Sequence, residues 1–342
     1  MPFGEYELYR ELREKVPVID AALDKTVRLI GSFSVACSDK AVERELNGFL
    51  KNVGTGGGGI YKFISVYLDQ LLTYGTAVGE IVLTGSGRDI YSIENVPLKN
   101  VELKYDDNMI DAVLCRPGVF GQNEPFECQE LLLMSALNPE PGRLAGVSVL
   151  HGLPFVSDVL MKIYSAIGVN WERLGNIRFA VTYKPSSEGD RSLSKNRAKQ
   201  IAEEWSKAMR DKESVSDFVS VGDVSIKVIG ADNQILDSEV PVRQMLEQII
   251  AKLSVPPFLL GLSWSTTERM SSQQADILTS ELEYYRRILD VVIGRIVNIW
   301  LQLHGFDCEF NVVWDNINLQ DELDLAKARL YNAQAAEIEK RL

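Results

Sequence analysis

A long helical periodicity near the end of the sequence constrains the fold most. Apolar residues recur at helical spacing from Ile277 to Trp300, and Ser271 to Gln274 fit a capping box, so we expect one helix over residues 271–303. At ~1.5 Å per residue this helix reaches roughly 50 Å, which suits a spar in a large assembly better than a helix in a small globule. The length of 342 residues also favours several modules over a single core.

Composition restricts the class of protein. With 46% hydrophobic and 25% charged residues the chain has ordinary globular usage. The formal net charge is −12, which disfavours a conventional DNA-binding protein, because such proteins neutralise phosphates with Lys and Arg. The acidic balance therefore argues against tight DNA binding, but not against DNA as cargo.

Residues that hold metals or carry out nucleophilic chemistry are scattered. The four cysteines form no CxxC pair, and His151 and His304 are remote from each other, so we expect no metal site, no cofactor and no catalytic residue. The charged start of the chain is not typical of a secretory signal. Residues 289–303 fall short of the roughly 20 residues that a membrane-spanning helix needs, so we expect no membrane span.

Periodicity along the chain predicts an α+β fold. The first 150 residues mix helices with strands, and the later residues repeat that mixture on a smaller scale. Expected helices begin at Val18 and at Ile60, the second ending at Gly75, and others cover 153–174, 194–212, 240–253 and 322–342. Expected strands are a hairpin of 77–83 with 89–93, the segments 101–105, 110–115, 130–134, 177–183 and 308–314, and two short strands within 217–229 around Gly222 and Asp223.

A glycine run, Gly54–Gly59, invites comparison with a phosphate-binding loop. The P-loop requires Gly-Lys-Ser/Thr where this chain has Gly59-Ile60-Tyr61, and we expect no strand before the run. A flexible connection between two helices is the favoured interpretation. A nucleotide-binding enzyme that uses this loop is the alternative.

Two clusters combine basic residues with other features. Arg191, Lys195, Arg197 and Lys199 lie near acidic residues, so they form either a solvated helix face or a docking surface. The run Tyr284-Tyr285-Arg286-Arg287 is similar to an aromatic and basic DNA contact, but only part of it can face one way on a helix. We expect Tyr285 to belong to the core.

The most informative segment is Val255-Pro-Pro-Phe-Leu-Leu-Gly261. Two prolines stop a helix there, and a short polar and aromatic loop up to Met270 precedes the long helix. Such a sequence of helix, rigid break, loop and helix predicts a projecting element.

With this segment the chain resembles the portal proteins of tailed bacteriophages, over most of its length. Residues 232–261 are similar to the family segment that runs up to a Val-Pro-Pro-x-Leu-Leu-Gly turn. Upstream, Leu71-Leu-Thr-Tyr-Gly-Thr-Ala77 resembles the family's Leu-x-x-x-Gly-Asn-Ala pattern, with Thr76 in place of Asn. Gly146-Val-Ser-Val-Leu150 resembles the family's entry to a stem helix.

The resemblance implies a portal-like subunit with a mixed wing, a helical stem, a small α/β clip and a reduced or absent crown. Residues 1–150 and 271–318 would form the wing, 151–175 and 240–258 the two stem helices, and 176–239 the clip. Residues 259–270 would be the tunnel loop, and 319–342 a short helix that is all that remains of the crown. The resemblance places Trp264, Ser265, Thr266, Thr267, Glu268 and Arg269 at the DNA channel.

The same resemblance implies partners and location. We expect a dodecameric ring in the virion, assembled in the host cytoplasm, with double-stranded DNA passing through it and with terminase, major capsid protein and a head-tail adaptor as partners. The chain itself would not be an enzyme, and the basic cluster Arg191, Lys195, Arg197 and Lys199 would dock the motor or the adaptor. A structural or scaffold protein that forms no channel is the second alternative.

Overall fold

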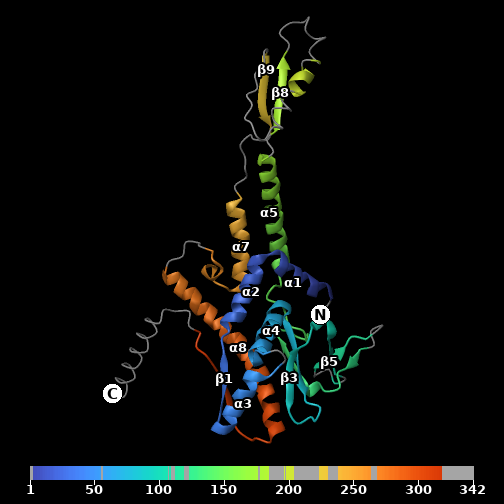
Figure 1. Ribbon diagram of the computed structural model, residues 1–342, viewed down its shortest axis with the longest axis vertical. Helices are drawn as coiled ribbons and strands as arrows, with labels where there is room; N and C mark the ends of the chain where they lie inside the picture. Colours follow the sequence, from blue (N-terminus) through green and yellow to red (C-terminus); the bar gives the residue numbers. More distant parts are fainter. Residues whose placement is uncertain are drawn as a thin grey trace, which may run out of the picture. The chain divides into compact units, whose positions relative to one another are not determined.

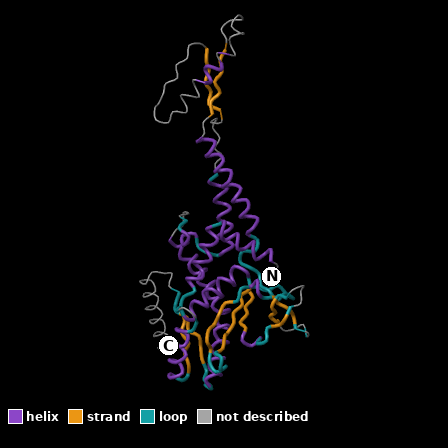
Figure 2. Tube along the Cα trace, turned by 45° about the vertical axis from the view of Figure 1, so that its right-hand side comes forward, coloured by secondary structure: helices purple, strands orange, loops and turns teal. Residues whose placement is uncertain are grey.

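The computed structural model describes residues 3–54, 57–106, 108, 112–118, 123–175, 178–184, 196, 198–203, 223–229, 238–262 and 268–317. It has mixed helices and small sheets, which confirms the predicted α+β class (Figures 1 and 2). The chain divides into two compact units: a large unit of residues 1–158 and 245–342, and a small unit of residues 159–244.

The large unit begins with a helical layer. Pro17 opens the second helix, as its fixed φ favours, and Ile19 and Leu23 are buried. Periodicity did not predict the first helix, residues 3–15, because the buried apolar face of that helix is small. The helices are α1 (Phe3–Lys15), α2 (Pro17–Leu29), α3 (Lys40–Asn52) and α4 (Gly59–Tyr74).

Arg13 holds three of these helices together. Its guanidinium, at the end of α1, donates hydrogen bonds to Asp20 of α2 and to Asp69 and Thr73 of α4, at 2.7 to 2.9 Å. Tyr6 also stacks on Tyr74, with 4.4 Å between the ring centroids. These contacts fix α1 in place despite its small apolar face.

The core of the large unit lies between α4 and a three-stranded antiparallel sheet. Gly75 ends α4 in the left-handed conformation, φ 75°, as a C-terminal glycine does, and the predicted hairpin follows. Buried Gln70 joins helix to sheet by hydrogen bonds to the backbone of Val78 and Val96. The sheet order is β3-β2-β7, with β2 (Thr76–Leu83), β3 (Ile90–Asn95) and β7 (Leu132–Ala136).

A second small sheet covers a satellite core. Val78, Val101, Leu114 and Leu132 are buried together there. The sheet order is β4-β5-β6, with β4 (Glu102–Tyr105), β5 (Ala112–Arg116) and β6 (Glu124–Pro125), and short 3-10 turns η1 (Leu98–Asn100) and η3 (Gln129–Leu131). The predicted strands 101–105, 110–115 and 130–134 are thus present, with starts shifted by one or two residues.

The long helix α8 (Glu268–His304) is confirmed but starts earlier than the capping box predicted. Glu268, Arg269 and Met270 are good helix formers and extend the helix upstream, so Ser271 lies inside it. One face is buried against α4, β7 and the last strand, with Leu289, Ile293 and Trp300 among its fully covered side chains. That strand, β10 (Phe310–Trp314), pairs antiparallel with β1 (Phe33–Cys37).

The small unit is entered and left by helices that begin or end in the large unit. Its strands pair from Arg178 opposite Ile229 to Lys184 opposite Asp223. The elements are α5 (Leu153–Gly175), β8 (Arg178–Lys184), β9 (Asp223–Ile229) and α7 (Glu239–Leu253). Of the two short strands predicted around Gly222 and Asp223, the second is confirmed as β9, which pairs with β8. The first, within residues 217–222, lies outside the described residues.

Arg286 of α8 is buried and joins segments from both ends of the chain. Its Nε and one Nη donate to the Ile30 carbonyl at 3.0 and 2.7 Å, and that Nη also donates to the Asp315 carbonyl at 2.8 Å. Its guanidinium carbon lies 5.0 Å from the centre of the Trp314 ring. Burial lowers the pKa of Arg286, yet an arginine stays charged in proteins, so these contacts satisfy a buried cation.

We predict that Arg286→Met destabilises the protein by about 3 kcal/mol, because the buried Ile30 carbonyl and the part-buried Asp315 carbonyl lose their charged donor. Arg287→Met removes the same group from the exposed neighbouring position and should change stability by less than about 0.5 kcal/mol. Denaturant unfolding of both variants at one protein concentration measures the difference. Equal midpoints for the two variants would contradict the role of Arg286.

Candidate functional site

The double-proline turn between α7 and α8 is built on buried anchors. Ile249 and Ile250 at the end of α7 and Val255 after it are all buried. Ser254 between them adopts φ 55°, a conformation that is uncommon for a residue with a side chain. The chain therefore turns sharply at a fixed point of the large unit.

The prolines then set a short rigid turn. Pro257–Leu260 forms the 3-10 turn η5, which packs beside α2. Leu259 and Leu262 donate backbone hydrogen bonds to the carbonyls of Pro256 and Pro257, both at 3.1 Å. Gly261 closes the turn with φ 74°, where glycine carries no steric penalty.

The six predicted channel residues begin where this turn ends. Trp264, Ser265, Thr266 and Thr267 lie outside the described residues. Glu268 is the first residue of α8, and Arg269 is exposed next to it. Of the segment 259–270, the structure thus assigns 259–260 to η5 and 268–270 to α8, so both ends of the loop are attached to regular elements.

The predicted docking cluster belongs to the small unit. Lys199 lies within residues 198–203, which are helical, and its side chain is exposed. Arg191, Lys195 and Arg197 lie outside the described residues. The structure therefore places one of the four side chains on a surface.

Two sequence motifs far apart in the chain meet in space. The Gly75 carbonyl accepts from the Leu137 N–H at 2.7 Å, the Gly146 N–H donates to Thr76 Oγ1 at 2.9 Å, and Ser148 Oγ donates to the Thr73 carbonyl at 2.6 Å. A side chain at Gly75 or Gly146 would overlap the other segment's backbone. Thr76, where the family pattern has Asn, supplies the oxygen acceptor that an Asn would also offer.

The glycine run connects two helices. It follows α3, whereas the P-loop follows a strand, and Gly59 is the first residue of α4 with φ 55°. A side chain at Gly59 would overlap the carbonyls of Leu50 and Lys51. Close approach of α3 and α4 explains this glycine without a phosphate.

His304 and the run Tyr284-Tyr285-Arg286-Arg287 have contacts within the fold. His304 stacks on Trp300, with 4.3 Å between ring centroids. Tyr284 donates to Asn138 at 2.9 Å, and burial raises the pKa of Tyr285, which is half-buried as part of the predicted core. Arg286, the fully buried member, is the one that pattern reasoning missed, because a cation in a helix is normally assigned to the surface.

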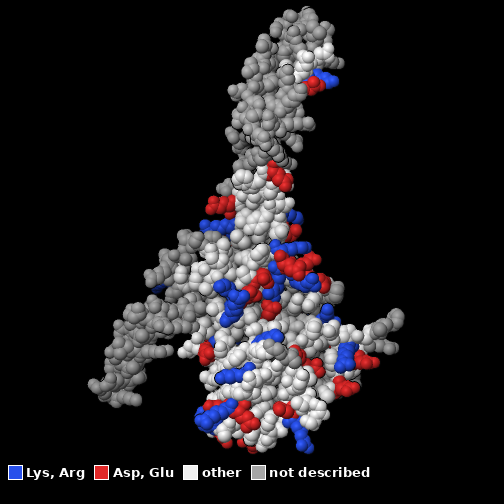
Figure 3. All heavy atoms as spheres, in the orientation of Figure 1, with Lys and Arg blue, Asp and Glu red and all other residues white. Residues whose placement is uncertain are grey.

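Helix α5 exposes apolar side chains on several sides. Phe155 is 77% and Trp171 66% exposed, and further exposed side chains are Met161, Tyr164 and Val169. Few charged side chains lie along its visible face (Figure 3). No helix within the described part of the chain is long and apolar enough to span a membrane, and the same residues contain no cluster of His, Cys, Asp and Glu that would hold a metal.

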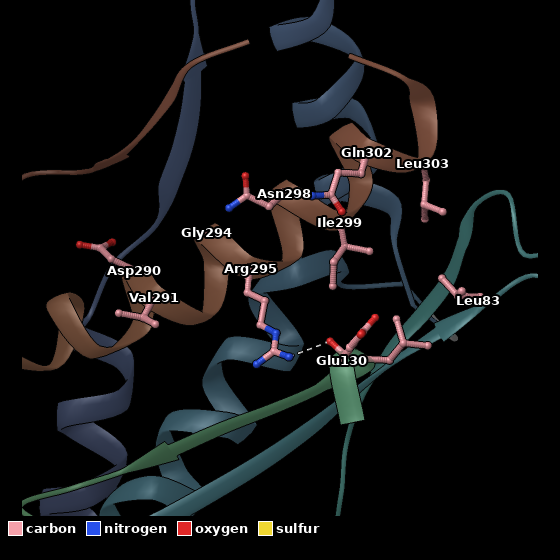
Figure 4. Close-up of a pocket in the computed structure, with 11 residues that line it drawn as sticks. Leu83, Glu130, Asp290, Val291, Gly294, Arg295, Asn298, Ile299, Gln302 and Leu303 are labelled. Atoms are coloured by element: carbon pink, nitrogen blue, oxygen red, sulfur yellow. Dashed lines mark hydrogen bonds between the residues drawn. The ribbon is translucent and has the colours of Figure 1, made fainter. Parts of the chain in front are cut away.

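A groove of about 620 Å³ lies between the second half of α8 and the end of β2 with η3 (Figure 4). Leu83 and Leu131 form one wall, and Val291, Ile299 and Leu303 of α8 the other. Arg295 crosses it and donates to the Glu130 carbonyl at 2.9 Å. The lining combines these apolar side chains with the polar residues Glu130, Asp290, Arg295, Asn298 and Gln302.

Comparison with known proteins shows which solved structures share this fold. No protein-family model and no curated protein matches the chain. A chain in the neck of the native gene transfer agent (GTA) particle, computed with C12 symmetry, matches with a TM-score of 0.67 at 14% identity, covering 98% of this chain and 90% of that one. The chain has the fold of that neck protein.

Two further solved structures are similar to the chain. A chain in the virion of the native GTA particle gives a TM-score of 0.67 at 12% identity, with the same coverage. An HK97 family phage portal protein from Corynebacterium diphtheriae gives 0.46 at 12% identity, covering 88% of this chain and 92% of that one.

Proposed function

We propose that the chain is a portal subunit. Copies of it form a ring at one capsid vertex, around a channel through which double-stranded DNA is packaged and ejected, and the ring joins head to tail. The fold shared with a GTA neck protein over 98% of the chain carries this proposal. The contact between the Gly75 and Gly146 motifs supports it independently, because it uses the residues on which the family resemblance rests.

The exposed surface of α5 supports a multi-subunit assembly. A large exposed apolar surface normally marks an interface, and α5 exposes Phe155 on one side and Tyr164 with Trp171, seven residues apart, on roughly the opposite side. Copies of the same helix on either side would cover them. A ring supplies two neighbours to every subunit, and the GTA neck was computed with C12 symmetry, so we propose a dodecamer.

Each region then has a task. Residues 1–150 and 271–318 form the wing, α5 and α7 the stem and 176–239 the clip, while 319–342 takes the position of the crown. The loop ending at Glu268 and Arg269 lines the narrowest part of the channel together with residues 264–267. Its rigid base at Pro256 and Pro257 holds the loop at a constant height in the ring.

The net charge of −12 suits a conduit. DNA slides only if few phosphates are neutralised, because every cationic contact releases counterions and strengthens binding. In this proposal the subunit is not an enzyme, and a separate terminase supplies the ATP-driven motor. The cluster Arg191, Lys195, Arg197 and Lys199 of the clip docks terminase or the head-tail adaptor, and the wing contacts the major capsid protein of the virion.

The first test is the quaternary structure of the purified full chain. We expect electron microscopy to show rings with a central hole. Monomers or solid oligomers at micromolar concentration would instead favour a scaffold protein without a channel. Binding of ATP or GTP by the same sample would favour the nucleotide-binding alternative.

The loop has a length-matched test. Replacing residues 263–267 by Gly and Ser should leave the rings intact and reduce DNA packaging or retention by at least ~10-fold, because Trp264 and its neighbours no longer border the channel. DNA content of assembled heads is the measurement. The same replacement at residues 84–88, the exposed turn between β2 and β3, is the control and should package normally. Normal packaging with the loop replaced would refute the assignment.

Charge reversal tests the docking cluster. Changing Arg191, Lys195, Arg197 and Lys199 to Glu should weaken binding of terminase or adaptor by at least ~10-fold, because like charges then face each other. Binding is measured between purified components at fixed ionic strength. The control changes four exposed basic residues of the large unit to Glu, giving the same net charge: Lys25, Lys51, Arg88 and Lys99. Equal affinity of the two variants would show that only net charge matters.

A further inference from the structure

Two of the four cysteines, Cys37 and Cys308, are neighbours in the fold although they lie near opposite ends of the sequence. Cys37 is the last residue of β1 and pairs with Phe310, the first residue of β10. The ladder continues for one more residue, because the Ser38 N–H donates to the Glu309 carbonyl at 3.0 Å. Cys308 comes directly before Glu309, so the two cysteines lie at the same end of this two-stranded sheet.

Alternation along the strand places both thiols on one face. Side chains two residues apart in an extended chain point to the same side, so Cys308 lies on the side of Phe310 and of Cys37. That side is the covered one, because Cys37 is 7% exposed and Phe310 is half-buried, while the alternate residues Glu309 and Asn311 are exposed. Burial and the adjacent thiol of Cys308 raise the pKa of Cys37 to about 11. The two sulfur atoms are therefore close enough to interact.

A bond between these sulfurs requires only a small movement of the backbone. In a regular ladder the α-carbons of diagonal partners lie roughly 7–8 Å apart, slightly more than a disulfide spans. Cys308 lies outside β10, in residues 306–309, which form neither helix nor strand. This short connection can shift without changing the pairing of β1 with β10.

The two thiols differ in exposure. Cys37 is buried, whereas Cys308 is partly exposed and lines a surface hollow of about 440 Å³ together with Asp39, Lys40 and Phe306. A small reagent in solution therefore reaches Cys308 first. An accessible thiol beside a covered one is the arrangement of a reacting cysteine and a cysteine that resolves the product.

We propose that Cys37 and Cys308 form a disulfide when the protein meets a small-molecule disulfide such as oxidised glutathione, and that this bond locks β1 to the start of β10. The reduced protein holds the two strands by backbone hydrogen bonds, and the oxidised protein adds a covalent link. The link closes a loop over most of the chain, and a longer closed loop gives a larger stabilisation. This inference concerns contacts within one chain and does not depend on the portal assignment.

The chemistry is thiol–disulfide exchange in two steps. The Cys308 thiolate attacks one sulfur of oxidised glutathione, the sulfur–sulfur bond of the reagent breaks, and one glutathione thiolate leaves. The Cys37 thiolate then attacks the Cys308 sulfur of this mixed disulfide and releases the second glutathione thiolate. The protons of the two cysteines pass through solvent to the two glutathione thiolates. The cysteines together lose two electrons, and the reagent gains them.

Oxidation of the purified full chain tests the bond. Cys128→Ser removes the exposed thiol, and this chain is incubated with oxidised glutathione, blocked with N-ethylmaleimide and digested with trypsin. We expect a peptide that links Cys37 to Cys308 to be at least ~10-fold more abundant than any peptide that links Cys115, because exchange requires access and a nearby second thiol. Cys115 is the internal control, since it is also buried but lies in β5. Mass spectrometry measures both products.

A matched variant moves the second thiol to the other face of the sheet. Cys308→Ser with Asn311→Cys, again with Cys128→Ser, places a thiol opposite Ala36, next to Cys37 along the ladder but on the exposed face. This variant should take up glutathione without forming a link to Cys37.

Thermal unfolding measures the lock. Oxidation should raise the unfolding midpoint of the Cys128→Ser chain by at least ~5 °C, and reduction with dithiothreitol should reverse the change. The same treatment should leave the midpoint of the chain with Cys128→Ser and Cys308→Ser unchanged. An unchanged midpoint despite complete linkage would overturn the locking role.

Three other results overturn the proposed bond. One is a Cys37–Cys308 peptide that is no more abundant than the links of Cys115. Another is a reaction that stops at glutathione attached to Cys308, and the third is linkage between copies only. None of these results affects the ring test by electron microscopy.

Discussion

The buried guanidinium of Arg286 is the contact on which the large unit depends. A buried cation needs acceptors, and the chain supplies the carbonyl at the end of α2, the carbonyl after β10 and the face of Trp314. The same contact favours glycine at position 31, because a β-carbon there would lie 2.9 Å from the Arg286 guanidinium. One side chain therefore fixes the first helices and the last strand against α8, and the two ends of the described chain share one core.

The backbone contact between Gly75 and Gly146 is a second constraint of the same kind. It joins the end of α4 to the segment that leads into α5, so hydrogen bonds add to the buried side chains of Leu150 and Leu153 in fixing the start of α5. Glycine is required on both sides, because any β-carbon would overlap the opposite backbone. The hydrogen bond between Gly146 and Thr76 joins residues that are 70 positions apart in the sequence. This contact explains why the patterns around Gly75 and Gly146 are the most informative ones upstream of the double proline.

Periodicity predicted α2, α4, α5, α7 and α8 because each has a continuous apolar face that repeats at helical spacing. It did not predict α1, which is held mainly by the ion pairs of Arg13, or the pairing of β1 with β10, whose partners are joined only through the tertiary fold. The start of α8 was missed because a capping-box pattern competes with good helix formers before it. The site was predicted only by family resemblance, since Trp264 to Arg269 carry no pattern of their own that points to a channel.

The exposed apolar side chains of α5 call for partners on more than one side. Copies that each carry a net charge of −12 repel one another, but this repulsion is screened beyond ~8 Å at physiological salt, so short-range apolar contacts decide association. On α5 the exposed side chains point in several directions, which requires neighbours on more than one side, as the proposed ring provides. The geometry of exposure on α5 therefore favours a contact between copies.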